Sequence, residues 1–330
     1  MIRLFAFFLL GLLPVGACDI PVFRYGLDYW PADDYRLETT AAESDPFPSG
    51  NPHANLFVET NETATASRLL FPDGESVAWT GEATPQTLAG LVDSPARAEI
   101  AKRILAGQSA VWIYVESGDA EKDDAAVGTV ETRLKYIESI AELPEIDPTD
   151  PANKMGPGPE LRIGFSLLRI PADSPEEELF LESLRGPEGS AGDAERPRGG
   201  FFVPVFGRGR ALALILDHEA EDATLIDDAC LFLLGACSCQ AKNLNPGWDL
   251  LMNINWTDAL EVAGVALASN SAAQPVALTK PETVTISADQ SKTGLDSHVI
   301  DGGRWTFIIL GAALASLLIG AVYFLLRKKS

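Results

Sequence analysis

The carboxy-terminal end constrains this chain most, because no side chain from residue 305 to residue 326 is charged. The hydrocarbon core of a bilayer is about 30 Å thick, and a helix of about 20 apolar residues spans it. Trp305 and Tyr323 stand near the two ends of this segment, where aromatic rings favour the membrane interface. An Arg-Lys-Lys run follows directly. The pattern predicts a transmembrane helix at 305–326 and a cytoplasmic basic tail at 327–330, so that the body lies outside the cytoplasm.

The amino-terminal end is typical of a secretory signal peptide. It reads MIRLFAFFLLGLLPVGAC, with one Arg, an apolar run too short to span a bilayer, and small residues before Cys18. We therefore expect residues 1–17 to be removed. The Val-Gly-Ala-Cys end also resembles a bacterial lipobox, which implies that Cys18 is acylated. Ordinary cleavage after Ala17, which leaves a free thiol, is the alternative.

Composition narrows the class of partner. The formal net charge of −22 repels a phosphate backbone, so we expect no nucleic-acid partner. The chain has no Walker loop, dinucleotide fingerprint, nucleophile elbow or HExxH pair, and its three histidines are dispersed. We therefore expect no cofactor. The expected partners are other extracytoplasmic or membrane proteins, and small residues at Gly311, Ala315, Ser316 and Gly320 suggest a homodimer through the membrane helix.

The middle of the chain alternates between strand and helix patterns. Short apolar runs rich in aromatic and β-branched residues predict strands, and apolar residues at three- and four-residue spacing predict amphipathic helices. In order, the expected elements are a strand in 109–119, a helix in 120–143, a strand in 161–170, a helix in 175–184, strands FFVPVF and ALALIL joined by the tight turn 207–210, and a helix in 224–235. The order is β-α-β-α-β-β-α.

This order resembles the thioredoxin fold over residues 107–260. Pro204 starts the third expected strand, where that family keeps a cis-proline, and a hairpin follows. The resemblance therefore implies a cis bond before Pro204. One departure matters: the family's CxxC motif lies between the first strand and first helix, and here that junction reads Ser117-Gly118-Asp119-Ala120. The family's redox chemistry does not carry over. The whole chain is also similar to uncharacterised exported bacterial proteins with a C-terminal anchor, which implies a setting but no activity.

The resulting organisation is an α/β body on a tether. We expect a smaller, incomplete α/β domain at 18–106 and the thioredoxin-like domain at 107–262, with DLLMNINW as its last strand. Residues 263–304 are rich in Ala, Ser, Thr, Gln and Pro and predict a flexible stalk.

The cysteines leave three hypotheses open. The stretch GACSCQAKNLNPGWD holds Cys237 and Cys239, and Cys230 lies shortly before it. In an oxidising compartment a structural disulfide at this corner is the first hypothesis. A thiol-disulfide exchange pair, Cys237 with Cys239, is the second, since the cation of Lys242 would lower a thiol pKa. Soft-metal binding of Cu or Zn by Cys230, Cys237 and Cys239 is the third.

One more pair is a candidate for ligand binding. Arg208 and Arg210 lie among glycines and could hold an anion, or simply be solvated charges of a turn. Because the junction at residues 117–120 lacks a thiol, the sequence favours a membrane-tethered extracytoplasmic interaction or assembly module that is not an enzyme. The alternatives are a thiol-disulfide oxidoreductase and a metal-binding protein.

Overall fold

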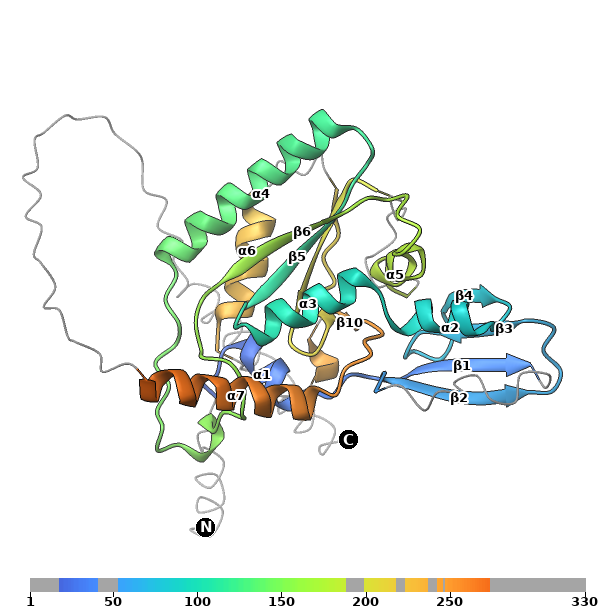
Figure 1. Ribbon diagram of the computed structural model, residues 1–330. Helices are drawn as coiled ribbons and strands as arrows, with labels where there is room; N and C mark the ends of the chain where they lie inside the picture. Colours follow the sequence, from blue (N-terminus) through green and yellow to red (C-terminus); the bar gives the residue numbers. More distant parts are fainter. Residues whose placement is uncertain are drawn as a thin grey trace, which may run out of the picture. The chain divides into compact units, whose positions relative to one another are not determined.

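The structure, a computed structural model, describes residues 18–40, 53–187, 199–217, 223–236, 242–245 and 247–273. They all belong to one compact unit that ends at Pro275. This unit is α/β, with a four-stranded and a six-stranded sheet that each mix parallel and antiparallel pairs (Figure 1). The predicted transmembrane helix, the basic tail and the signal peptide lie outside the described residues.

The described helices and strands have the following bounds. The helices are α1 (Val22–Tyr29), α2 (Pro85–Val92), α3 (Pro95–Leu105), α4 (Ala120–Ile140), α5 (Glu178–Leu184), α6 (Ala223–Leu234) and α7 (Trp256–Ala273), with 3-10 turns at Pro151–Asn153 and Lys242–Leu244. The strands are β1 (Tyr35–Thr40), β2 (Leu56–Asn61), β3 (Ser67–Leu70), β4 (Val77–Gly81), β5 (Ala110–Val115), β6 (Phe165–Ile170), β7 (Phe201–Phe206), β8 (Arg210–Ala211), β9 (Leu216–Asp217) and β10 (Trp248–Asp249).

The larger sheet confirms the order of elements predicted for the middle of the chain. Its strands lie in the order β10-β8-β7-β5-β6, and β9 also pairs with β7. β5 and β6 are parallel, and the long helix α4 connects them. β7 is antiparallel to β5 and forms a hairpin with β8. All six residues of β5, AVWIYV, are fully buried, as their uniformly apolar character predicts.

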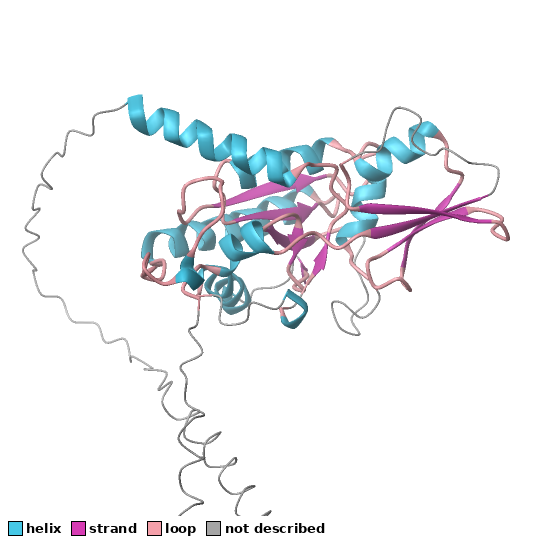
Figure 2. Ribbon diagram, turned by 90° about the horizontal axis from the view of Figure 1, so that it is seen from below, coloured by secondary structure: helices cyan, strands magenta, loops and turns pink. Residues whose placement is uncertain are grey.

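Alternate residues of β5 enter two different hydrophobic clusters, because side chains in a strand point alternately to its two faces. Trp112 and Tyr114 pack in the cluster that is covered by α1, α4 and α6. Val111 and Ile113 pack in the second cluster, which α3, α5 and α7 cover. Figure 2 shows these helices on either side of the strands.

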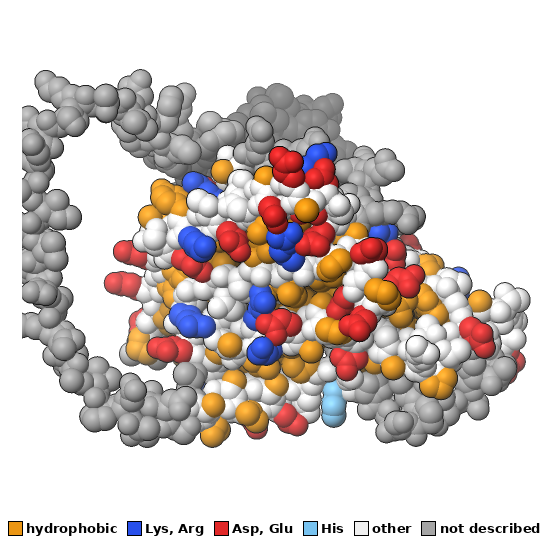
Figure 3. Space-filling view, turned by 45° about the horizontal axis from the view of Figure 1, so that its top comes forward, with side chains coloured by type: hydrophobic (Ala, Val, Ile, Leu, Met, Phe, Trp, Pro, Cys, Tyr) orange, Lys and Arg blue, Asp and Glu red, His pale blue; other side chains and the backbone are white. Residues whose placement is uncertain are grey.

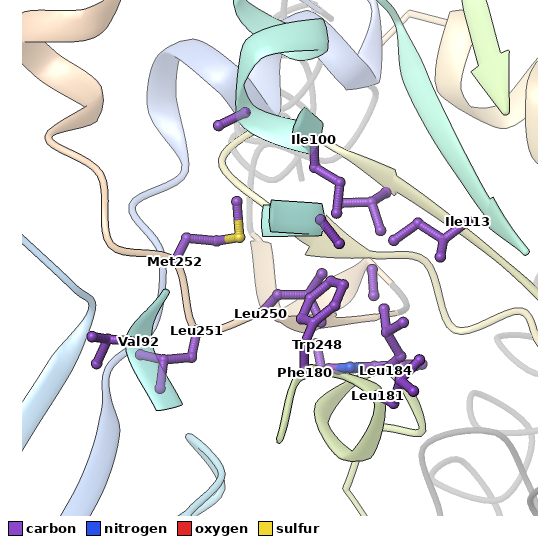
Figure 4. Close-up of a cluster of buried hydrophobic side chains, with 14 of the residues drawn as sticks. Val92, Ile100, Ile113, Phe180, Leu181, Leu184, Trp248, Leu250, Leu251 and Met252 are labelled. Carbon is purple, nitrogen blue, oxygen red and sulfur yellow. The ribbon is translucent and has the colours of Figure 1, made fainter. Parts of the chain in front are cut away.

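The second cluster is where distant parts of the chain meet (Figure 4). Ile113 of β5, Ile100 of α3 and Phe180 of α5 are fully buried there. Trp248 of β10 joins them and donates a 3.0 Å hydrogen bond from its indole to the carbonyl of Ser183. Burial of each large side chain stabilises the fold by about 1.5–3 kcal/mol, so this cluster fixes α3, α5 and β10 against one sheet face.

The smaller sheet shares this core. Its order is β2-β1-β3-β4, with β1 parallel to β2 and antiparallel to β3. Tyr35 and Leu37 of β1 are fully buried and belong to the same cluster as Ile113. Helix α1 packs instead on the opposite face of the larger sheet. The domain boundary at residue 106 stays a prediction, but hydrophobic contacts run across it.

The helix starts follow local sequence signals. Thr84 and Ser94 each precede a proline, and each accepts a hydrogen bond from the amide three residues later, at 3.1 and 3.3 Å. Asp119 caps α4 in the same way through the amide of Lys122. A side-chain cap of this kind stabilises a helix by about 1 kcal/mol, so these boundaries are encoded locally.

The expectation of a cis bond before Pro204 is wrong, because none of the described peptide bonds is cis. Pro204 lies in the middle of β7, opposite Trp112. Its carbonyl accepts a 2.9 Å hydrogen bond from the amide of Leu212, so its nitrogen also faces the hairpin partner rather than β5. The N–H group that proline lacks would therefore point toward the chain beyond the end of β8. A strand tolerates proline at such a position.

The same proline explains why ALALIL is not one continuous strand. β8 ends at Ala211, and β9 resumes at Leu216 with a register displaced by two residues on β7. A ladder cannot continue normally past a residue that lacks an N–H group.

The expectation that DLLMNINW is a strand is wrong. Only Asp249 of it belongs to a strand, and Asn253 forms an isolated bridge with Ala54 before α7 begins. Helix α7 continues to Ala273, so the first residues of the expected stalk, 263–273, are helical. Residues 274–304 lie outside the described residues.

Candidate functional site

The junction between β5 and α4 is the position at which the resemblance predicts chemistry. β5 ends at Val115, and the chain turns through Ser117, Gly118 and Asp119 into the helix. Gly118 has a φ of +90°, which a residue with a side chain rarely adopts. The turn therefore depends on glycine.

A buried carboxylate fastens this turn from inside. Asp123, in the first turn of α4, is 2% exposed. Its oxygens accept hydrogen bonds from the Tyr114 hydroxyl at 2.7 Å, the Ser117 hydroxyl at 2.7 Å, the Ser117 amide at 3.0 Å and the Gly118 amide at 3.2 Å. Four donors on one carboxylate leave it fully engaged.

The electrostatics at the junction follow from these bonds. Burial acts to raise the pKa of Asp123, but the hydrogen bonds from Tyr114, Ser117 and Gly118 outweigh it and hold the pKa below its ordinary value. Burial, and then the bond to Asp123, raises the pKa of Tyr114. The hydroxyl of Ser117 also accepts a 3.2 Å bond from the amide of Asp119. These groups stabilise the turn and are not free to act on a substrate.

Two further contacts brace the junction, although Ser117, Gly118 and Asp119 are themselves exposed. Gly199 approaches the carbonyl of Glu116 so closely that a Cβ atom there would lie 2.3 Å from the oxygen. Arg169 donates to Glu116 and to Asp124, each at 2.7 Å, across the outer side of the turn. The residue that the sequence analysis missed is Asp123. It lies four residues after the cap residue Asp119, where an acidic side chain at the start of a helix is usually solvated.

The corner that carries Cys237 and Cys239 lies outside the described residues, but its two flanks do not. Before it, Ala236 forms an antiparallel bridge with Pro21, and the amide of Val22 donates to the carbonyl of Gly235 at 3.0 Å. The first described residues of the body therefore lie against the end of α6.

After the corner, a buried charge network holds the chain. Lys242 forms ion pairs with Asp33, at 2.9 Å, and with Asp249, and its side chain is 11% exposed. Arg210 pairs with the other oxygen of Asp249 at 3.1 Å. Lys242 is thus paired with two carboxylates. Its expected effect on the pKa of Cys237 or Cys239, which lie outside the described residues, stays a prediction.

The two hairpin arginines are internal rather than poised for an anion. Arg210 is 6% exposed and donates to the carbonyls of Asn245 and Gly247 as well as to Asp249. Arg208 donates to the carbonyls of Leu27 and Asp28 at the end of α1. Burial lowers the pKa of Arg208. Both side chains join the hairpin to α1 or to the corner.

The described cysteines are apart from one another and unpaired. Cys18 and Cys230 are free and buried. Burial raises the pKa of Cys18, and burial with the nearby carboxylate of Asp227 raises the pKa of Cys230 to about 12. Cys230 packs between α4 and α6 in the hydrophobic cluster. Among the described residues, no group of three His, Cys, Asp or Glu side chains could hold a metal ion.

A shallow hollow of about 290 Å³ lies where α7 begins. Arg208, His53 and Trp256 contribute to its lining. The guanidinium of Arg208 is already bonded to the carbonyls at the end of α1. On the face shown in Figure 3, acidic and basic side chains are interspersed, so this face presents no extended surface of one charge.

Within the part of the chain that the structure describes, no helix has both the length and the apolar character needed to cross a membrane. The predicted span at 305–326 is not part of it. No family model, curated protein or solved structure matches this chain.

Proposed function

We propose that this chain is a membrane-tethered extracytoplasmic module that binds or assembles with other proteins and is not an enzyme. The body, residues 18–273, would lie outside the cytoplasm, with the apolar segment 305–326 as its anchor. The partners are other extracytoplasmic or membrane proteins, and pairing of two anchors is a possible homodimer contact.

The topology supports a thioredoxin-like body. A parallel pair, β5 and β6, is joined by a helix on one face, and an antiparallel β7–β8 hairpin continues the sheet. Helices α4 and α6 cover one face, and α5 covers the other. This is the β-α-β-α-β-β-α arrangement to which the sequence is similar, preceded by α1 and the smaller sheet. Fold alone does not imply function, so the argument rests on the site.

The observation that carries the proposal is that the junction between β5 and α4 holds no thiol and that its polar groups are hydrogen-bonded to Asp123. In thioredoxin-like enzymes a reactive thiol stands there, whereas here Asp123 binds both Ser117 and Gly118 from within. The hydrogen-bonding capacity of these residues is used to hold a turn. A body that keeps this fold without a reactive group at its usual place is better suited to binding than to catalysis.

The redox and metal alternatives receive less support. For the redox alternative, the cation of Lys242, which was expected to activate Cys237 or Cys239, is paired with Asp33 and Asp249. For the metal alternative, the thiol of Cys230 is fully buried in a hydrophobic cluster.

Photo-crosslinking in native membranes tests the proposal. A photoreactive residue at Tyr136 or Ile140, which are 47% and 56% exposed on α4, samples one open face. Lys122, near the start of the same helix, is a matched control position with a 59% exposed side chain. We expect a discrete adduct with a membrane or exported protein that differs between the two ends of the helix. Turnover of a disulfide substrate that disappears in a Cys237→Ser, Cys239→Ser variant, without any adduct, would contradict the proposal.

A further inference from the structure

The chain contains an Asn-x-Thr sequence at the exposed end of β2. Asn61 is the last residue of that strand, and Glu62 and Thr63 form the turn that follows. Glu62 and Thr63 are exposed, and Asn61 is half-buried. The turn is closed by a 3.2 Å hydrogen bond from the amide of Ala64 to the carbonyl of Asn61. In exported proteins, Asn-x-Thr in a surface turn is the acceptor sequence for N-linked glycans.

The side chains of this sequence adopt a defined arrangement. The Oδ1 atom of Asn61 accepts hydrogen bonds from the amide of Thr63 at 3.1 Å and from the hydroxyl of Thr63 at 2.9 Å. Both bonds use the oxygen of the amide group. The Nδ2 atom, which would carry a glycan, donates instead to the carboxylate of Glu38, and this bond has to open during a reaction.

A second Asn-x-Thr sequence, at residues 255–257, provides an internal comparison. Asn255 caps α7: its Oδ1 accepts from the amide of Asp258 at 3.2 Å, and its Nδ2 donates to the carboxylate of Asp258 at 2.8 Å. The middle residue, Trp256, is only 7% exposed. The side-chain nitrogens of both asparagines thus donate to a carboxylate. The two sequences differ because Asn255 begins a helix beside the buried Trp256, whereas Asn61 begins a turn whose next two residues are exposed.

The residues that precede the two sequences also differ. Glu59 stands two positions before Asn61, and Asn253 stands two positions before Asn255. An acidic residue at that position belongs to the longer acceptor sequence that bacterial oligosaccharyltransferases use. Glu59 is half-buried and lies 3.5 Å from Arg36. Only the first sequence therefore combines an exposed middle residue with an acidic residue two positions before the asparagine.

We infer that Asn61 is an acceptor for an N-linked glycan, an inference that rests on the proposed extracytoplasmic position of the body. The Nδ2 atom attacks the anomeric carbon of a glycan carried on a polyprenyl diphosphate. A carbon–nitrogen bond forms, the carbon–oxygen bond to the diphosphate breaks, and Nδ2 loses one proton to a base of the transferase. The polyprenyl diphosphate leaves, and no oxidant or reductant is required.

The test compares full-length protein purified from its own membranes in detergent, by intact mass and by mapping of the modified peptide. We expect the wild-type chain to carry a glycan mass on the peptide that contains Asn61. Asn61→Gln and Thr63→Ala should lose that mass completely. Thr63→Ser should keep it, because the hydroxyl remains, and Asn255→Gln should keep it because that site is not modified. A urea denaturation midpoint for each variant shows that a lost glycan does not reflect a lost fold.

Two results would overturn the inference: an unmodified wild-type chain, or a glycan that persists in Asn61→Gln. If the wild-type chain is unmodified, an impermeant thiol reagent applied to intact cells carrying Tyr136→Cys separates the two proposals. Labelling would show that the body is outside and that only the glycan inference fails. Absence of labelling would show that the extracytoplasmic placement fails with it.

Discussion

The hydroxyl of Tyr114, in the fully buried strand β5, donates a 2.7 Å hydrogen bond to the carboxylate of Asp123 on the helix that follows. Through this bond the strand, the turn and the helix share one acceptor. Because Asp123 holds these three segments together, its replacement should lower the free energy of unfolding.

Asp123→Ala should destabilise the protein by about 3 kcal/mol, because it leaves buried donors of Tyr114 and Ser117 without an acceptor. Tyr114→Phe removes one donor but leaves the carboxylate its other bonds, so a loss of about 1–2 kcal/mol is expected. Urea denaturation of the detergent-solubilised full chain measures both values. The neighbouring Asp124, whose side chain is 69% exposed, is the control. Equal losses for Asp123→Ala and Asp124→Ala would show that the buried carboxylate has no special role.

The same carboxylate predicts a dependence of stability on pH. The pKa of Asp123 is lower in the fold than its ordinary value, so its contribution is fully present above the unfolded pKa of about 3.9. The contribution is lost as the pH falls through the still lower folded pKa. The stability difference between wild type and Asp123→Asn should therefore shrink on acidification below about pH 4. Denaturation midpoints measured from pH 2 to pH 6 give this difference. A difference that stays constant over this range would mean that Asp123 does not titrate with the lowered pKa.

Thiol chemistry distinguishes the described cysteines from the other two. Cys18 and Cys230 are buried, and the pKa of Cys230 is about 12, so neither should react with a maleimide at pH 7 without denaturant. Any label that the native, reduced chain takes up should map to Cys237 or Cys239. Peptide mapping after labelling, with and without denaturant, checks this. Rapid native labelling of Cys230 would show that the packing of α6 on α4 is wrong.

The ion pairs of Lys242 predict that replacing this residue lowers the stability of the protein and does not change the reactivity of the thiols. Lys242→Met leaves the buried Asp249 with Arg210 as its one cationic partner among the described residues and should destabilise the protein by about 2–3 kcal/mol. Lys122→Met is the matched control, since its side chain is 59% exposed and lies 4.0 Å from Asp119. The maleimide reaction rate of Cys237 and Cys239 in reduced protein should be unchanged in both variants. A rate that falls only in Lys242→Met would restore the activating role.

Elements with a regular pattern of apolar residues or a local cap signal were predictable from the sequence. The apolar run of β5, the regular spacing along α4 and the Thr84-Pro85 and Ser94-Pro95 helix starts each act through local rules. The β8–β9 interruption was not predictable, because it depends on which neighbour the nitrogen of Pro204 faces.

The burial of charged side chains was the second feature that could not be predicted from the sequence. Arg97 and Arg210 are almost fully buried, although charged residues are normally solvated. Arg97 donates to the carbonyl of Leu251 and lies over the ring of Phe180, and both partners are more than 80 residues away in the chain. Such pairings arise only after distant segments pack, so composition and periodicity cannot indicate them. The role of Asp123 was missed for a similar reason, because it depends on the burial of this carboxylate in the folded chain.

The side of the membrane on which the body lies is the measurement that bears most directly on this account. In a Cys237→Ser, Cys239→Ser background, an impermeant maleimide is applied to intact cells that carry either Tyr136→Cys or Ser330→Cys. Tyr136 is 47% exposed on the body, and Ser330 lies in the basic tail. We predict that Tyr136→Cys is labelled on intact cells and that Ser330→Cys is labelled only after permeabilisation. The reverse pattern, or full-length protein recovered in the soluble fraction without detergent, would contradict the account.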